Sequence, residues 1–106
     1  MATDPSPRHA ISWNRRGLDR LRAFGDRAKE LGVLVDWVAT LRRVIDRLES
    51  DPRGCGDPLY PLRSLDLMVY RVIVDRVEVV YGVHDSRPLV FVQDIRPRFG
   101  HPLEGT

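Results

Sequence analysis

The arginines are the residues of this sequence with the clearest chemical potential. The chain contains 16 arginines and one lysine, Lys29, and a guanidinium makes planar, bidentate contacts with phosphate that an ammonium does not. In an extended chain, the period of two puts Arg96 and Arg98 on the same side, although Pro97 weakens regular pairing there. Together with Arg71, these two arginines form a candidate phosphate-binding cluster.

The alternative role for the same arginines is structural. From residue 69 onward, five arginines are matched by five acidic residues. Cross-strand ion pairs with Asp75, Glu78 and Asp94 would each contribute only a few tenths of a kcal/mol. The net charge of +2 supports nucleic-acid binding only weakly, and arginine-rich codon usage also explains the excess over lysine. Both interpretations stay open at this point.

Histidine, tyrosine and cysteine provide further candidates. A histidine side chain ordinarily changes charge near neutral pH, so His101 and His84 could move protons. The three histidines lack metal-ligand spacing, so neither a metal nor a cofactor is expected. Tyr81, like Tyr70, is either a base-stacking residue or a core residue whose hydroxyl reaches the rim. Cys55 is the single cysteine, which excludes an intrachain disulfide.

Two helices are expected in the N-terminal half. Apolar residues three or four positions apart predict a helix over residues 15–31 and a second from residue 33 or 34 to 49. Asn14 is a suitable N-cap for the first helix, and Gly32 suits its left-handed end. Because few residues join them, the helices should be antiparallel neighbours. The first helix begins with a dense basic stretch whose role the sequence does not decide.

Strands are expected on either side of the helices. A short strand fits residues 9–13, and a change of period from 3.6 to 2 predicts an antiparallel meander of three strands. Residues 51–64 contain three prolines and two glycines, too many for regular structure. The three meander strands should cover residues 67–74, 77–83 and 89–95.

These elements predict one α+β domain over residues 1–106, with loose tails at 1–7 and 99–106. Helices that cover one face of the sheet leave the other face partly solvated, which is where functional residues could lie. No apolar run approaches the roughly 20 residues that a membrane span needs, and the first residues lack the apolar segment of a signal peptide. A cytoplasmic protein is therefore expected.

The order of elements and four short phrases along it resemble the RelE/ParE toxin superfamily, small bacterial proteins that are paired with antitoxins. The resemblance spans roughly residues 9–98, and it implies a RelE-like β-α-α-β-β-β fold and a cognate antitoxin as partner. No phrase is specific alone; their order and spacing carry the resemblance. The phrases are Leu48-Glu-Ser-Asp-Pro52, Val69-Tyr-Arg-Val72, Val80-Tyr-Gly-Val83 and Val90-Phe-Val-Gln-Asp-Ile-Arg-Pro-Arg98.

The resemblance implies candidate site residues. The RelE branch cuts messenger RNA in the ribosome without a metal, by attack of a 2′-hydroxyl on the neighbouring phosphate, whereas the ParE branch inhibits DNA gyrase. Arg71 and Arg98 match basic positions of the family, and Arg96 lies close by. In a catalytic protein these arginines would neutralise phosphate, and Glu78 or His101 would accept the proton. The same three arginines, with Tyr81, would contact the nucleic acid.

Two departures from the family pattern bear on this chemistry. Glu78 stands where an arginine is expected, three residues before the Tyr-x-Val phrase, and the expected C-terminal aromatic is absent from the tail that begins at His101. The chain is therefore either an endoribonuclease with substituted positions or a non-catalytic member of the same fold. The non-catalytic alternatives are a gyrase inhibitor and a protein-interaction module. Outside the family, a small nucleic-acid-binding domain stays open as well.

Overall fold

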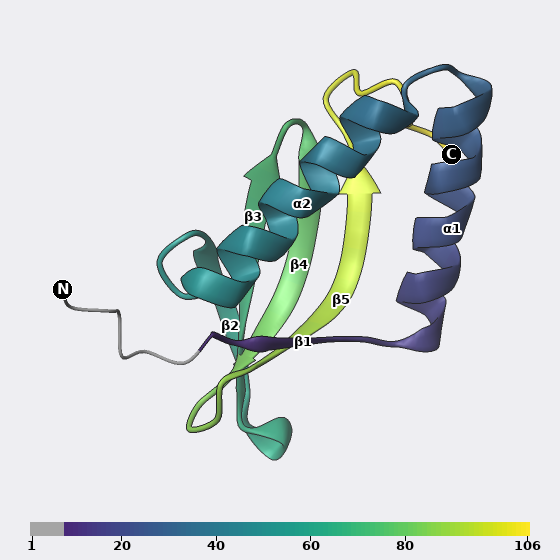
Figure 1. Ribbon diagram of the computed structural model, residues 1–106. Helices are drawn as coiled ribbons and strands as arrows, with labels where there is room; N and C mark the ends of the chain where they lie inside the picture. Colours follow the sequence, from purple (N-terminus) through teal and green to yellow (C-terminus); the bar gives the residue numbers. More distant parts are fainter. Residues whose placement is uncertain (1–7) are drawn as a thin grey trace, which may run out of the picture.

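Figure 1 shows the computed structural model, which describes residues 8–106 as two α-helices, a short 3₁₀ helix (η1) and a five-stranded sheet. The predicted α+β class is confirmed, and the main elements lie within a few residues of their expected positions. In chain order they are β1 (Ala10–Trp13), α1 (Arg15–Glu30), α2 (Leu34–Ser50), β2 (Asp57–Leu62), η1 (Arg63–Leu65), β3 (Leu67–Val74), β4 (Val77–His84) and β5 (Leu89–Pro97).

The sheet has one more meander strand than the sequence predicts. Its order is β1-β5-β4-β3-β2, with β1 parallel to β5 and every other pair antiparallel. The expectation of irregular structure over residues 51–64 is wrong, because residues 57–62 form β2 along β3. Pro58 and Pro61 are tolerated there because β2 is an edge strand, and its register shifts between Pro58 and Tyr60.

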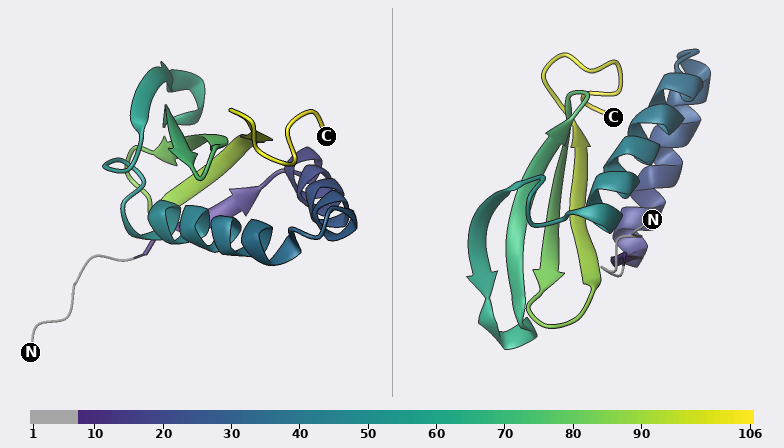
Figure 2. Two further views of the ribbon diagram at one scale, coloured as in Figure 1. Left: turned by 90° about the horizontal axis from the view of Figure 1, so that it is seen from above. Right: turned by 60° about the vertical axis from the view of Figure 1, so that its left-hand side comes forward.

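Both helices lie on the same side of the sheet (Figure 2). Asn14 caps α1 as predicted, since its side-chain oxygen accepts a hydrogen bond from the Gly17 amide at 2.7 Å. Gly32 has a φ of 73° and allows the chain to reverse between the helices. The predicted helical hairpin is therefore confirmed, and α2 packs Trp37, Val44 and Leu48 into the core.

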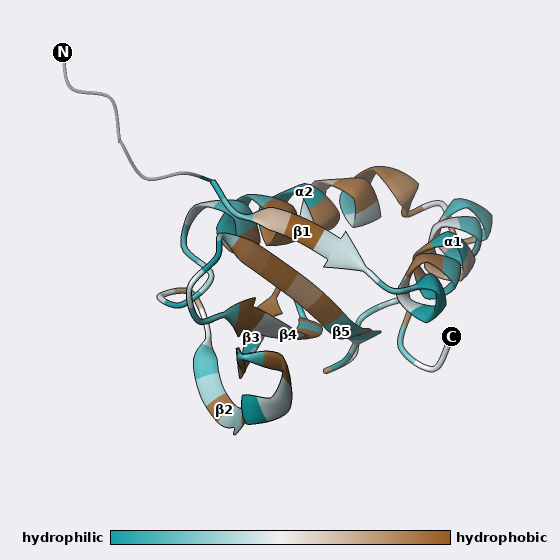
Figure 3. Ribbon diagram, turned by 90° about the horizontal axis from the view of Figure 1, so that it is seen from below, coloured by the Kyte–Doolittle hydropathy of each residue, from teal (hydrophilic) through white to brown (hydrophobic). Residues whose placement is uncertain are grey.

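Alternation along β4 gives the sheet two different faces. Val77, Val79, Tyr81 and Val83 are fully buried and belong to the core. Residues between them, such as Glu78, point to the opposite face, which neither α-helix covers (Figure 2). Figure 3 shows β5 as largely hydrophobic and the edge strand β2 as more hydrophilic.

The C-terminal residues are ordered against the body of the protein. Leu103 is completely buried and belongs to the core. Its amide donates to Nδ1 of His101 at 3.0 Å, and the Gly100 amide donates to Oε1 of Glu104 at 3.0 Å. The expectation of a loose tail over residues 99–106 is therefore wrong, because an apolar anchor holds the segment. The expected tail at residues 1–7 lies outside the described residues.

Candidate functional site

The helix-free face of the sheet brings together most of the predicted site residues. Glu78 of β4 lies opposite Arg96 of β5 in the register, and Val80 lies between Arg71 of β3 and Asp94 of β5. We call this cluster the arginine face. Its members on the sheet and directly after β5 are Arg71, Glu78, Asp94, Arg96 and Arg98. We include Arg20 of α1 as well, because it reaches Asp94 beyond the end of the β1–β5 pairing.

Glu78 lies between two arginines of the arginine face. Its Oε1 lies 3.0 Å from Nε of Arg98, and its Oε2 lies 3.4 Å from Nη1 of Arg71. The Glu78 side chain is 15% exposed, whereas those of Arg71 and Arg98 are 45% and 44% exposed. The carboxylate is thus largely covered, while both guanidinium groups keep N–H donors available to a ligand.

Asp94 holds the second pair of arginines. Its Oδ2 accepts a hydrogen bond from Nε of Arg96 at 2.6 Å, and its Oδ1 lies 3.6 Å from Nη1 of Arg20. β5 contains a bulge here, which is seen as a shift in the β4–β5 register between the pairs made by Val80 and Tyr81. Arg20 comes from the basic start of α1, whose role the sequence did not decide. Four guanidinium groups around two carboxylates leave this face positively charged and suited to phosphate.

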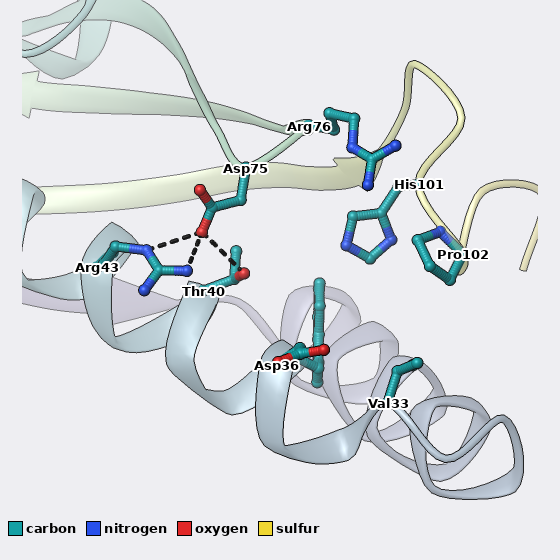
Figure 4. Close-up of a pocket in the computed structure, with 9 residues that line it drawn as sticks. Val33, Asp36, Thr40, Arg43, Asp75, Arg76, His101 and Pro102 are labelled. Carbon is teal, nitrogen blue, oxygen red and sulfur yellow. Dashed lines mark hydrogen bonds and ion pairs between the residues drawn. The ribbon is translucent and has the colours of Figure 1, made fainter.

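The predicted ion pairs are only partly as expected. Glu78 and Asp94 pair with arginines of this face, but Asp75 turns to the other side of the sheet. There it forms a close ion pair with Arg43 and accepts a hydrogen bond from Thr40 at 3.1 Å (Figure 4). The bond from Arg43, followed by that from Thr40, keeps the pKa of Asp75 below its ordinary value in spite of some desolvation. Asp75 therefore ties the β3–β4 turn to α2.

Tyr81 does not belong to a nucleic-acid surface, and this corrects the sequence-based proposal. Its side chain is completely buried, and its hydroxyl donates to the carbonyl of Pro52 at 2.7 Å. Burial, and then the contact with Cys55, raises the pKa of Tyr81. The ring stacks on Tyr70 with centroids 5.8 Å apart. No base can stack on Tyr81 while this packing is intact.

His101 lies apart from the arginine face. Its ring makes an edge contact with Trp37 of α2, with centroids 5.9 Å apart, on the side of the sheet opposite Glu78. Its Nδ1 is occupied by the Leu103 amide, and burial, followed by the charge of Arg76, lowers its pKa. His101 lines a pocket of about 350 Å³ beside α2 (Figure 4). The two proposed proton acceptors are thus not brought together.

Phe99 is a candidate that the sequence-based reasoning missed. It follows Arg98 directly, its side chain is 59% exposed, and its φ is 55°. A bulky residue in the left-handed region is strained, and such strain concentrates at functional positions. The signal in the sequence that could have identified it is its place as an aromatic residue directly after the basic residue Arg98.

Neither a metal site nor a membrane span is found in the described part of the chain. Among residues 8–106, no group of three His, Cys, Asp or Glu side chains could hold a metal ion. Neither helix in this range combines the length and the apolar composition that crossing a membrane requires.

Comparisons with known proteins identify the fold. No family model matches the sequence, and no curated protein matches it significantly. Among solved structures, a chain of the archaeal RelE–RelB complex from Pyrococcus horikoshii OT3 superposes with a TM-score of 0.53 at 19% sequence identity. The match covers 87% of this chain and 97% of that chain. This protein therefore has the RelE-like α+β fold that the order of its elements indicated.

Proposed function

We propose that this protein is the toxin of a toxin–antitoxin pair and that its arginine face binds the phosphate backbone of RNA in the cytoplasm. The observation that carries the proposal is the cluster of four arginines around two carboxylates on the open face of a RelE-like sheet. Arginine forks match phosphate oxygens in geometry and charge. Phe99, exposed next to Arg98, adds an aromatic surface on which a base can stack.

Cleavage of messenger RNA at the ribosome is the activity we propose for this face. When a 2′-hydroxyl attacks the neighbouring phosphate, negative charge grows on the phosphoryl oxygens, and Arg71, Arg96 and Arg98 would stabilise it. Glu78 is the carboxylate nearest to these arginines and is the candidate proton acceptor. Both of its oxygens face arginines, so one ion pair must open before it can take a proton.

A specific observation favours a second, non-catalytic candidate. The carboxylate of Glu78 is already engaged by Arg71 and Arg98, and His101 lies on the other side of the sheet. A protein that only binds its target, such as a gyrase inhibitor or an interaction module, needs the positive face but no free proton acceptor. Growth arrest without cleaved RNA would distinguish this candidate from the nuclease.

The surface of α2 supports an antitoxin partner. Val35 is 82% exposed, and Leu34 and Val38 are each 38% exposed. They line a groove of about 550 Å³ together with Arg42 and Arg43. Exposed apolar side chains beside arginines suit an amphipathic segment that carries acidic residues. The similar archaeal RelE is found in a complex with RelB, which supports a comparable partner here.

Induction of the protein alone in a bacterial host tests the proposal. We expect growth arrest with cleaved messenger RNA, and Arg98→Ala should abolish both while the protein stays folded. Arg22→Ala is the matched control, because Arg22 is exposed on α1 outside the arginine face. Absence of growth arrest would reject both toxin candidates. Arrest with intact RNA and blocked DNA supercoiling would support gyrase inhibition instead.

A further inference from the structure

A second basic cavity lies beside the arginine face, between the start of α1 and β5. It has a volume of about 230 Å³, smaller than the roughly 300–1,000 Å³ typical of small-molecule sites. We call it the α1–β5 pocket. The β5 bulge described above supplies two of its side chains, and α1 supplies the opposite wall. Its lining residues are Arg16, Gly17, Arg20, Gln93, Asp94 and Arg96.

The charge in this pocket is unbalanced. Three guanidinium groups line it, and Asp94 is its single carboxylate. Asp94 is shared by Arg96 and Arg20, at 2.6 Å and 3.6 Å. Arg16 forms no ion pair with any residue in the range 8–106. An anion in the cavity would therefore meet more positive than negative charge.

Arg20 also leaves a donor without an acceptor. Its Nε is buried and has no hydrogen-bond partner among the described residues, while its guanidinium carbon lies 5.4 Å from the centre of the Phe24 ring. A buried polar group without a partner is costly, and an oxygen of a bound anion would satisfy it. The first turn of α1 contains no acidic residue, so no carboxylate there opposes an anion, although the Gly17 amide already donates to Oδ1 of Asn14 and the anion would be held by side chains.

We propose that the α1–β5 pocket is an oxyanion site that takes one phosphate group, and that on RNA this is a backbone phosphate next to the one held by the arginine face. The RNA part rests on the proposed function. Arg20, Asp94 and Arg96 belong to both sites. One RNA strand could therefore run from Arg98 towards Arg16 and stay in contact with arginines along the way. Gln93 and the three arginines supply N–H donors for the phosphate oxygens.

Titration of the protein with inorganic phosphate tests the pocket directly. The ¹⁵N–¹H signals of arginine side chains should shift for Arg20 Nε, and the shift should saturate. Gln93→Glu keeps the size of the side chain but adds a negative charge, and we expect it to remove the saturable shift. Arg22→Ala should leave the shift unchanged. An unresponsive Arg20 signal, or a normal response in Gln93→Glu, would overturn the proposal.

Binding of a labelled single-stranded RNA tests the extension to nucleic acid. Arg16→Ala should reduce the slope of log K against log salt by about 0.7, the value for one lost phosphate contact on a single strand. Arg22→Ala should keep the full slope, and an unchanged slope in Arg16→Ala would overturn the RNA part. The phosphate titration does not depend on toxicity. The phosphate-site proposal can therefore be rejected while growth arrest is observed, and it can be supported when no growth arrest is observed.

Discussion

Glu78 and Arg98 form an ion pair, with Oε1 of the carboxylate 3.0 Å from Nε of the guanidinium. This pair joins β4 to the residue that follows β5, and it lies on the face of the sheet without helices. The same carboxylate also faces Arg71. Glu78 therefore has two possible roles. It either accepts a proton in a reaction at the arginines, or it only reduces the positive charge that these arginines offer to a ligand.

Glu78→Gln separates these two roles. The change keeps the shape of the side chain but removes its charge and its ability to accept a proton. If Glu78 is the proton acceptor, cleavage of messenger RNA should fall by about 10²–10⁴-fold while RNA affinity rises, because the arginines lose their counter-charge. If Glu78 only limits charge, affinity rises and no cleavage is lost. Single-turnover cleavage and equilibrium binding measure the two effects. Lower affinity in Glu78→Gln would contradict both roles.

Phe99→Gly should increase stability and decrease RNA binding. Glycine adopts a positive φ without strain, so relief of the Phe99 backbone is expected to add roughly 1 kcal/mol to the free energy of unfolding. Loss of a stacked aromatic should weaken single-stranded RNA binding by about 1–3 kcal/mol. Urea denaturation and RNA titration measure the two quantities. Unchanged RNA affinity in a stabilised variant would show that the exposed ring has no role in binding.

Tyr81→Phe tests the buried hydrogen bond to Pro52. Without the hydroxyl, the Pro52 carbonyl loses its 2.7 Å partner, and we expect about 1–3 kcal/mol less stability in urea denaturation. Tyr60→Phe is the control, because Tyr60 is 46% exposed and its hydroxyl has solvent available. Equal effects of the two changes would mean that the buried bond contributes nothing specific.

The same tyrosine should make the protein sensitive to alkali. The folded state raises the pKa of Tyr81 above its ordinary value of 10.0, so above that pH the unfolded state releases a proton that the folded state retains. Stability should therefore fall as pH rises beyond 10.0. In Tyr81→Phe this fall should be smaller, as urea denaturation at increasing pH would show. An equal fall in both proteins would contradict the assignment.

His101 should destabilise the protein as the solution becomes acidic. In the folded state its pKa lies below the ordinary value of 6.5. Below pH 6.5 the unfolded state therefore binds a proton at this histidine that the folded state does not bind. Stability is then lost from 6.5 down to the folded pKa. Glutamine has no titratable group, so in His101→Gln the free energy of unfolding should decrease less between about pH 7 and about pH 5. An identical pH dependence in the variant would exclude His101 as the source.

Most of the elements could be predicted because local chemistry determines them. Asn14 and Gly32 mark the ends of α1 by hydrogen bonding and by a positive φ, and the apolar period changes from helix to strand after residue 65. The β3–β4 hairpin turns at Asp75 and Arg76, between the two predicted strands, although both residues have positive φ values, 50° and 62°, without being glycine. Ordinary turn preferences would have placed Asn-Gly there.

The remaining features depend on contacts between distant parts of the chain. The prolines of β2 are acceptable only because the strand lies at an edge, which the local sequence does not reveal. Arg20 joins the arginine face because α1 lies beside the β5 bulge at Asp94. Leu103 looked like part of a loose tail because a single apolar residue gives no periodic pattern, yet it is completely buried.

The parallel pairing of β1 with β5 has a consequence for the order of assembly. Ala10 pairs with Leu89, which lies 79 residues later in the sequence, so the sheet edge that precedes α1 cannot form until β5 has left the ribosome. Pairing over such a separation slows folding, while the local β3–β4 hairpin can form early. The arginine face and the α1–β5 pocket both contain residues of β5, so neither proposed phosphate site can be complete before β5 has been synthesised and paired.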